Sequence, residues 1–356
     1  MTKKLEPPPK LLNINSPWKK NENPIWLAST LCLSRNIEKF NFPSKLSSDK
    51  RNQIISLVSK EIVGFESVVD PVLFRSEEMT PFEKEYLYEH FLTTRSFQEA
   101  HHGEGFVVDK SGQFLTAINV QDHLLFLMTD TSGELERTLN YLNKIESEIG
   151  KNIHYAFSPK FGFLTANIND VGSGFSIYTY LQVPALIHTR SIEEFLIKNS
   201  DDSISVTGLQ GRPNEIIGDL IVVHNNYTLG MTEETILSHV RTFTIKLLVR
   251  EKGLRSEIKK NGDPKMKDKV SRAFGLLRHS YQIDAIEALD AISLVKLGVD
   301  IEWIKGLSVA TLNLLMFDIR RVHLQFQFAE EFPKEELTHK RSEFIHEALK
   351  EAELLI

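Results

Sequence analysis

A short group of polar side chains separates two apolar segments near the middle of the chain. Leu115–Ile118 and Leu124–Leu127 are largely apolar, and between them lie Asn119, Val120, Gln121, Asp122 and His123. Carboxylates and imidazoles are side chains that often transfer protons in enzymes. Buried polar groups that do no chemistry must instead be hydrogen-bonded. The stretch is therefore either the edge of an active site or a buried, hydrogen-bonded turn, and for the pair Asp122–His123 we favour the turn.

Other reactive residue types have simple structural interpretations. Cys32 lies between apolar neighbours and is expected to face the core, because a reactive thiol needs a basic setting. The pair His101–His102 precedes a glycine and fits an exposed loop. The pair Arg320–Arg321 is expected on the surface of a helix.

Composition excludes several classes of function. The formal net charge of −6 gives no electrostatic case for binding nucleic acid. A single cysteine excludes a disulfide framework, and the twelve histidines form no H-x-x-x-H pair, so we expect no metal site. Residues 1–23 are rich in Lys, Pro and Asn and predict a loose arm, and no window has the ~18 apolar residues of a membrane span. We expect a cytoplasmic protein.

The elements that position these residues can be read from apolar runs and helical periodicity. Leu135, Leu139, Leu142 and Ile149 fall on one face of a helix. Short apolar runs bounded by Gly, Pro, Asn or Asp predict strands at Ile25–Leu33, Gly105–Val108, Phe114–Ile118, Ser176–Leu186 and Asp219–Val223. Strands separated by helices in this way predict an α+β fold with a mostly antiparallel sheet and flanking helices.

The pattern changes after Gly230, where the chain becomes helical. Thr232 followed by two glutamates predicts a helix start, and the helix runs to a charged break around 259–264. Further helices are expected at Val270–Leu277, Ile283–Leu297, Thr311–Phe328 and Phe344–Leu355. We therefore predict a sheet domain over 24–231, a helix and linker over 232–264, and an all-α domain over 265–356 that mediates dimerisation or covers the first domain.

Three blocks of residues resemble the guanidino kinases, and most closely the bacterial protein arginine kinases. They are the strand Leu27–Asn36, the turn Asn119–His123, and the segment from Gly162 through Gly172 and Gly174 to Leu186. The resemblance implies transfer of phosphate from ATP, with Mg, to arginine side chains of proteins, which marks those proteins for Clp-type degradation.

The same alignment of motifs places neutral residues where active members of that family use charged ones. Gln121 stands at the position of the catalytic base, and Val120 at its acidic neighbour. The former nucleotide pocket includes Ser29, and its arginine positions hold Thr30, Cys32, Leu125 and Ser176. The mobile loop keeps Gly208 and Glu215, a guanidinium-contacting glutamate, but has Arg212 in place of an acid. The phosphoarginine-binding motif near the C-terminus matches Leu337–Ser342 only in its basic half.

These substitutions lead to a hypothesis and two alternatives. The first is a degenerate kinase without cofactor, with a binding or regulatory role in protein quality control. Its partners would be arginine-bearing protein segments, held by the charge of Glu215 and the amide of Gln121, and Clp-type machinery or an activator protein. The alternatives are an active kinase with a rebuilt site for ATP and Mg, and a scaffold with no ligand. Arg212 either binds an anion or lies at a solvated loop tip.

Overall fold

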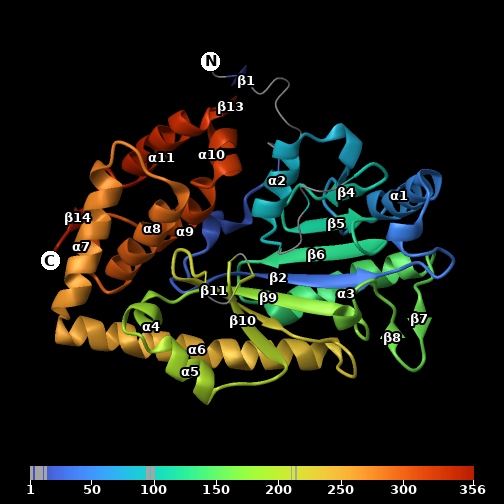
Figure 1. Cartoon of the computed structure of the whole chain (residues 1–356), viewed down its shortest axis with the longest axis horizontal. Helices are drawn as coiled ribbons and strands as arrows, with labels where there is room; N and C mark the ends of the chain where they lie inside the picture. Colours follow the sequence, from blue (N-terminus) through green and yellow to red (C-terminus); the bar gives the residue numbers. More distant parts are fainter. Residues whose placement is uncertain are drawn as a thin grey trace.

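Eight strands form one fully antiparallel sheet at the centre of the molecule (Figure 1). This computed structural model describes residues 3–4, 11, 14–93, 97, 101–209, 211–212 and 215–356. Across the sheet the strands are β10 (Ile204–Gly208), β11 (Leu220–Asn225), β9 (Phe175–Gln182), β2 (Trp26–Arg35), β6 (Leu124–Asp130), β5 (Phe114–Ile118), β4 (Gly105–Val108) and β3 (Val72–Arg75). Two-residue ladders join β1 (Lys3–Lys4) to β13 (Glu330–Glu331), β7 (Phe157–Ser158) to β8 (Gly162–Phe163), and β12 (Ile304–Lys305) to β14 (Glu353–Leu354).

Helices lie on both faces of this sheet because its central strands are apolar on both sides. Apart from Trp26, every residue of β2 is buried. Leu27, Leu31 and Leu33 of β2 share a core with the helices of one face, α1 (Ser48–Val63), α3 (Leu135–Gly150) and α6 (Glu233–Asn261). The opposite face carries α2 (Pro81–His90), which packs against α10 (Arg321–Phe328). The predicted fold class is confirmed.

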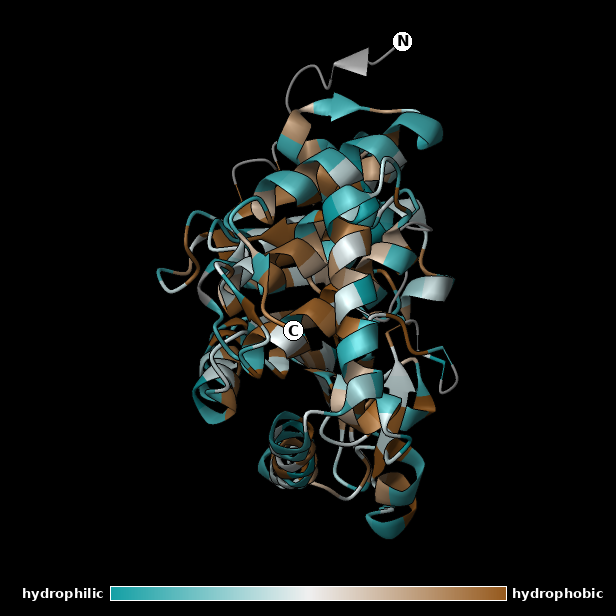
Figure 2. Cartoon of the chain, turned by 90° about the vertical axis from the view of Figure 1, so that its left-hand side faces the viewer, coloured by the Kyte–Doolittle hydropathy of each residue, from teal (hydrophilic) through white to brown (hydrophobic). Residues whose placement is uncertain are grey.

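The C-terminal part is a layer of helices beside the sheet. Its members are α7 (Pro264–His279), α8 (Ala285–Asp300), α9 (Val309–Asp318), α10 and α11 (Lys334–Ala348), and the short helices α4 (Pro184–His188) and α5 (Ile192–Lys198) lie near α6 (Figure 1). Seen from the helical side, hydrophobic residues gather between the helices and hydrophilic ones lie outward (Figure 2). Of the described residues, no helix combines the length and apolar character of a membrane span.

Capping residues set the ends of α6 as the sequence predicts. The hydroxyl of Thr232 accepts a hydrogen bond from the amide of Thr235 and so begins the helix. At the other end Gly262 has a φ of 60°, a left-handed conformation that glycine adopts easily. Asp263 then caps α7 and Pro264 occupies its first turn. The charged break around 259–264 is therefore a sharp helix–helix corner.

Several predicted elements differ from the observed ones. The predicted strand Ser176–Leu186 ends at Gln182, because Pro184 starts α4. Strand β6 follows the polar turn directly and was not expected as a separate strand. The predicted helix Thr311–Phe328 is two helices, α9 and α10, since Arg320 has an extended backbone with ψ of 159°. No glycine or proline marks this break, so periodicity alone could not reveal it.

The described part of the segment 1–23 is not a loose arm. Trp18 is fully buried and stacks on Phe317 of α9 with 3.8 Å between ring centroids. The side chain of Asn313 on α9 donates hydrogen bonds to the carbonyls of Asn21 and Asn23 at 2.9 and 3.0 Å. The prediction for residues 1–2, 5–10 and 12–13 lies outside the described residues. The N-terminal segment thus ties the sheet domain to the C-terminal helices.

Candidate functional site

The turn between β5 and β6 is a buried network of hydrogen bonds. Asn119 has a φ of 62°, and its side-chain amide donates to the carbonyls of Arg51 and Gly103, each at 3.0 Å. The carboxylate of Asp122 accepts from the side chain of Asn36 at 2.6 Å and from the amide of Ala166 at 2.7 Å. These contacts fix the end of β2 to the turn. They are what the predicted buried, hydrogen-bonded turn requires.

His123 completes the turn as a neutral imidazole. Its Nδ1 accepts the amide N–H of Ile37 at 3.0 Å, which places the proton on Nε2, and Nε2 donates to the carbonyl of Asn41 at 2.9 Å. Burial lowers the pKa of His123 from 6.5 to about 4, so the ring stays uncharged at neutral pH. Both ring nitrogens are engaged, and therefore His123 positions backbone and has no free nitrogen for proton transfer.

Gln121 is the exposed member of this turn. It stands where the resemblance places the catalytic base, and its amide carries no charge and cannot accept a proton from a guanidinium. Its neighbours Asp122 and His123 are both almost completely buried. The turn therefore keeps its shape through buried groups and offers solvent a neutral amide.

The predicted nucleotide positions lie together in the sheet, but most of them face one side. Cys32 pairs directly with Ser176 of β9, and Ser34 pairs with Leu125 of β6. Because side chains alternate along a strand, Thr30, Cys32, Leu125 and Ser176 share one face, and Ser29 points to the other. There the hydroxyl of Ser29 is hydrogen-bonded to Thr179 at 3.2 Å.

That face of the sheet is closed by apolar side chains. Each of the five predicted positions is at most 6% exposed. The hydroxyl of Thr30 donates to the carbonyl of Phe91 at 3.1 Å, just beyond α2. Cys32 and Leu125 belong to one buried apolar cluster, whose other members include Leu115, Leu127, Phe91, Phe97 and Phe106. The expectation that Cys32 is a small core residue is met.

The loop between β10 and β11 carries the other predicted residues. Arg212 and Glu215 form an ion pair of 2.6 Å, with side chains 71% and 42% exposed. A Cβ at Gly208 would overlap the carbonyl oxygen of Glu215, so glycine lets the two ends of the loop touch. Arg212 therefore lies at a solvated loop, and its partner is Glu215.

The structure does not bring Glu215 and Gln121 together. Gly208 pairs with Ile221, which is aligned through Leu181 with Trp26 at the start of β2. The turn that holds Gln121 adjoins Leu124, which pairs with Arg35 at the other end of β2. At about 3.3 Å per residue the two ends of β2 are ~30 Å apart. In this conformation, Glu215 and Gln121 therefore cannot both contact the same arginine side chain, although the sequence predicted that they would.

Two buried arginines, Arg35 near the turn and Arg341 in the C-terminal segment, serve the fold. Arg35 is buried, pairs with Glu146 at 2.7 Å and donates to the carbonyl of Ser173 at 2.9 Å. Its guanidinium lies 3.6 Å from the ring centroid of Phe163. In the C-terminal segment Leu337–Ser342, Arg341 is buried and donates to the carbonyls of Ile319 and Ile283 at 2.8 and 2.9 Å. Both arginines are satisfied within the chain.

Solved structures share the fold of this chain. A lombricine kinase structure aligns with a TM-score of 0.57 and 18% identity over 68% of this chain and 72% of that one. The duplicated taurocyamine kinase from Schistosoma mansoni aligns with a TM-score of 0.57 and 21% identity over 64% of this chain, which spans 33% of that longer protein. The fold is that of the phosphagen kinases.

Sequence comparisons identify the family of this chain within the phosphagen kinase fold. Residues 53–254 match the ATP:guanido phosphotransferase C-terminal catalytic domain, and residues 263–354 match the protein-arginine kinase McsB C-terminal domain. The protein-arginine kinase of Chlamydia pneumoniae is 32% identical over 338 residues, 92% of each chain. That of Clostridium acetobutylicum is 29% identical over 341 residues, 95% of this chain and 99% of the relative. The chain belongs to the protein-arginine kinase family of ATP:guanido phosphotransferases.

Two features of the site were not found from the sequence. The first is the apolar cover over the predicted nucleotide positions, which includes Phe91 and Phe97. The sequence shows that these residues follow a helix, but it does not show which face of the sheet they cover. The second is Arg320, which was expected at the surface. It is partly buried and lines a half-open pocket between the sheet and the C-terminal helices, where burial lowers the pKa of its guanidinium. The break between α9 and α10 at Arg320 turns its side chain inward.

Proposed function

We propose that this member of the protein-arginine kinase family does not transfer phosphate and instead binds arginine-bearing protein segments, in a regulatory role within protein quality control. The observation that carries the proposal is the closed face of the sheet around Thr30, Cys32, Leu125 and Ser176. These side chains are neutral and buried among apolar neighbours. A triphosphate needs cations there, because desolvated phosphates without charged partners are costly.

The residues present therefore do not fit a nucleotide. A hydrogen bond to a charged group contributes about 1.5–3 kcal/mol. Losing several arginine–phosphate contacts weakens ATP binding by several orders of magnitude, at about 1.4 kcal/mol per tenfold. A missing general base lowers the rate by a further ~10²–10⁴. Gln121 at the base position and the four neutral positions both support a protein without kinase activity.

Titration calorimetry with ATP and magnesium, together with a phosphoarginine assay, tests this part of the proposal. We expect no heat of binding and no acid-labile phosphate on an arginine-rich unfolded protein, with the Chlamydia pneumoniae relative as positive control. Turnover that disappears in Glu215→Ala would refute the proposal and establish the active-kinase alternative.

The binding role is supported by the exposed carboxylate of Glu215. It already holds one guanidinium, that of Arg212, at 2.6 Å. An exposed ion pair of this kind contributes only about 0–1 kcal/mol. An arginine of a partner protein can therefore replace Arg212 at little energetic cost.

Titration with an arginine-rich peptide and its lysine counterpart tests the binding role. We expect tighter binding of the arginine peptide, and weaker binding in Glu215→Ala. Gln121→Ala is the matched control, because Gln121 is exposed but lies at the far end of the sheet, and it should bind as the parent protein does. Equal affinity for both peptides would leave only the scaffold alternative.

The proposed partners include a second copy of the chain and Clp-type degradation machinery or an activator. Dimerisation through the helical part remains a prediction. Light scattering on the full-length protein should give twice the mass of one chain, and a monomer at all concentrations would contradict it.

A further inference from the structure

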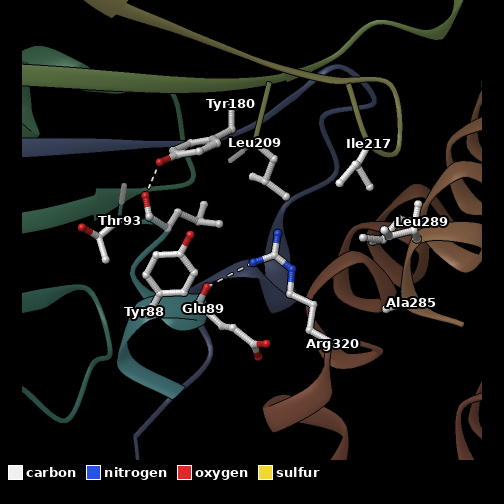
Figure 3. A pocket seen from close by; sticks show the side chains of 11 residues that line it. Tyr88, Glu89, Thr93, Tyr180, Leu209, Ile217, Ala285, Leu289 and Arg320 are labelled. Carbon is white, nitrogen blue, oxygen red and sulfur yellow. Dashed lines mark hydrogen bonds between the residues drawn. The ribbon is translucent and has the colours of Figure 1, made fainter. Parts of the chain in front are cut away.

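A cavity of about 200 Å³ lies where the sheet meets the C-terminal helices. Apolar side chains of four segments form its walls: Leu92 after α2, Leu209 and Ile217 in the loop between β10 and β11, and Leu289 on α8. Figure 3 shows the guanidinium of Arg320 pointing into this space from the start of α10. The cavity is thus apolar in its walls but has a cation at one side.

Arg320 has few partners in the part of the chain that the structure describes. Its guanidinium donates one long hydrogen bond of 3.5 Å to the carbonyl of Glu89 (Figure 3). It also lies over the ring of Phe317, 5.6 Å from the centroid. Among the described residues no carboxylate forms an ion pair with it. The carboxylate of Glu89 is instead hydrogen-bonded to Nδ1 of His323 at 2.9 Å.

The neighbouring residue shows what an ordinary surface arginine does in this helix. Arg321 is 56% exposed and pairs with Glu85 at 2.8 Å. The two adjacent arginines thus differ: Arg321 has a carboxylate partner, and Arg320 is partly buried against a pocket. Even partial burial of a guanidinium without an anion is unfavourable, because the group loses part of its water and no anion replaces it.

A second polar group faces the same cavity. Tyr88 lines it, and its hydroxyl forms no hydrogen bond with a described residue; Figure 3 shows the Tyr88 ring on the opposite side of the Glu89 backbone from Arg320. The hydroxyl of Tyr180, by contrast, donates to the carbonyl of Leu92 (Figure 3). The pocket therefore presents the guanidinium of Arg320 and the hydroxyl of Tyr88, both with unused hydrogen-bonding capacity, beside the carboxylate of Glu89, which is hydrogen-bonded to His323.

We propose that this cavity binds a small carboxylate with a short hydrocarbon chain, held by Arg320 and Tyr88. The planar guanidinium matches the two oxygens of a carboxylate, and the phenol adds a donor. Glu89 also lines the pocket, but its carboxylate is hydrogen-bonded to His323, so the Arg320 guanidinium is available to a monoanion; phosphate near neutral pH carries more than one negative charge. The leucine and isoleucine walls suit a hydrocarbon chain. The cavity has room for only a few heavy atoms, since one water already takes up ~30 Å³ of liquid.

Binding of this kind would link two parts of the protein. Leu209 and Ile217 flank the exposed loop that carries Glu215, and Leu289 and Arg320 belong to the helical layer. A ligand between them joins the loop to the helices. The inference does not depend on the proposed absence of kinase activity, because none of its residues occupies a nucleotide position of the motif.

The experiment is titration of the full-length protein with sodium butyrate, by calorimetry and by thermal unfolding, against sodium chloride at equal ionic strength. We expect saturable binding with a dissociation constant between about 10 µM and a few mM, as for ligands of about six heavy atoms, and a rise in melting temperature. Butyramide, which has the same shape without the charge, should not bind. Saturable binding of phosphate with no binding of butyrate would overturn the choice of a carboxylate.

Variants locate the site. Arg320→Gln should weaken butyrate binding at least tenfold, Tyr88→Phe about threefold to tenfold, and Arg321→Gln, the matched control, not at all. Ala285→Leu fills the cavity and should also abolish binding, which keeps the test decisive if Arg320→Gln fails to fold. Unchanged binding in Arg320→Gln or in Ala285→Leu, equal binding of butyramide, or no binding of butyrate would each refute the proposal.

Discussion

Around Thr30 and Cys32 the sheet is covered by apolar side chains, whereas around Tyr180, on the same face, a cavity remains and a guanidinium enters it. The first region holds the nucleotide positions predicted from the motifs, and its hydroxyl and apolar groups are buried. The second lies outside those motifs and carries an arginine without a carboxylate partner among the described residues. On one face of the sheet, the positions predicted to bind phosphate are therefore neutral and buried, while a cation lies at a place that no motif marks.

The largest expected effect comes from restoring a motif arginine in the closed region. Cys32→Arg places an uncompensated charge in a buried cluster and should lower the free energy of unfolding by about 3–5 kcal/mol. Cys32→Ala, the control, should lower it by only about 1 kcal/mol. Denaturant unfolding measures both. If Cys32→Arg is as stable as the parent and now binds ATP, the region is an open nucleotide site and the contrast with the Arg320 cavity disappears.

A smaller effect is expected in the turn that supports the closed region. Asp122→Ala removes the acceptor of two hydrogen bonds, from Asn36 and Ala166. Leaving those buried donors unpaired should reduce the free energy of unfolding by about 2–4 kcal/mol. Gln121→Ala in the same turn should change it by less than about 0.5 kcal/mol, because the side chain is exposed. Equal losses in the two variants would argue against a structural role for Asp122.

The buried histidine of the turn gives a dependence on pH. The pKa of His123 is lowered from 6.5 to about 4, so the unfolded chain binds a proton at this residue more readily than the folded one. Stability should therefore fall as the pH drops from about 6.5 towards 4. Unfolding measured at pH 7 and pH 5 should show the loss, and His123→Asn should reduce the difference between the two. An identical difference in the variant would assign the effect to other groups, such as His90, whose pKa burial lowers to about 3.

The smallest effect concerns the exposed ion pair of the loop. Arg212→Gln frees the carboxylate of Glu215 and should strengthen binding of an arginine peptide by at most about fivefold, since an exposed pair contributes about 0–1 kcal/mol. Calorimetric titration of the variant and the parent provides the comparison. Weaker binding in Arg212→Gln would mean that Arg212 itself contacts the partner and that the proposed displacement is wrong.

The sequence predicted those parts of the fold that depend on local pattern. Strands β4 and β5 begin and end where their apolar runs do, and Thr232 caps α6 as expected. The family likeness was visible in three ordered blocks and is confirmed over the sheet and the helical part. The burial of Cys32 followed from its apolar neighbours.

Long-range contacts could not be predicted in the same way. The separation of Glu215 from Gln121 depends on strand register and on the conformation of one loop, neither of which has a local signature. The inward turn of Arg320 depends on a helix break without glycine or proline. At the N-terminus, Trp18 could have shown that the segment is packed, because a large aromatic residue in a polar segment indicates a docking contact.

The stacking of Trp18 on Phe317 also bears on how the chain is made. The two rings are far apart in the sequence. The carbonyls of Asn21 and Asn23 also find their hydrogen-bond donor on the same helix, α9. Ribosomes add about 5–20 residues per second. The indole therefore stays without its partner for tens of seconds during synthesis, so this segment emerges long before it can reach its final place.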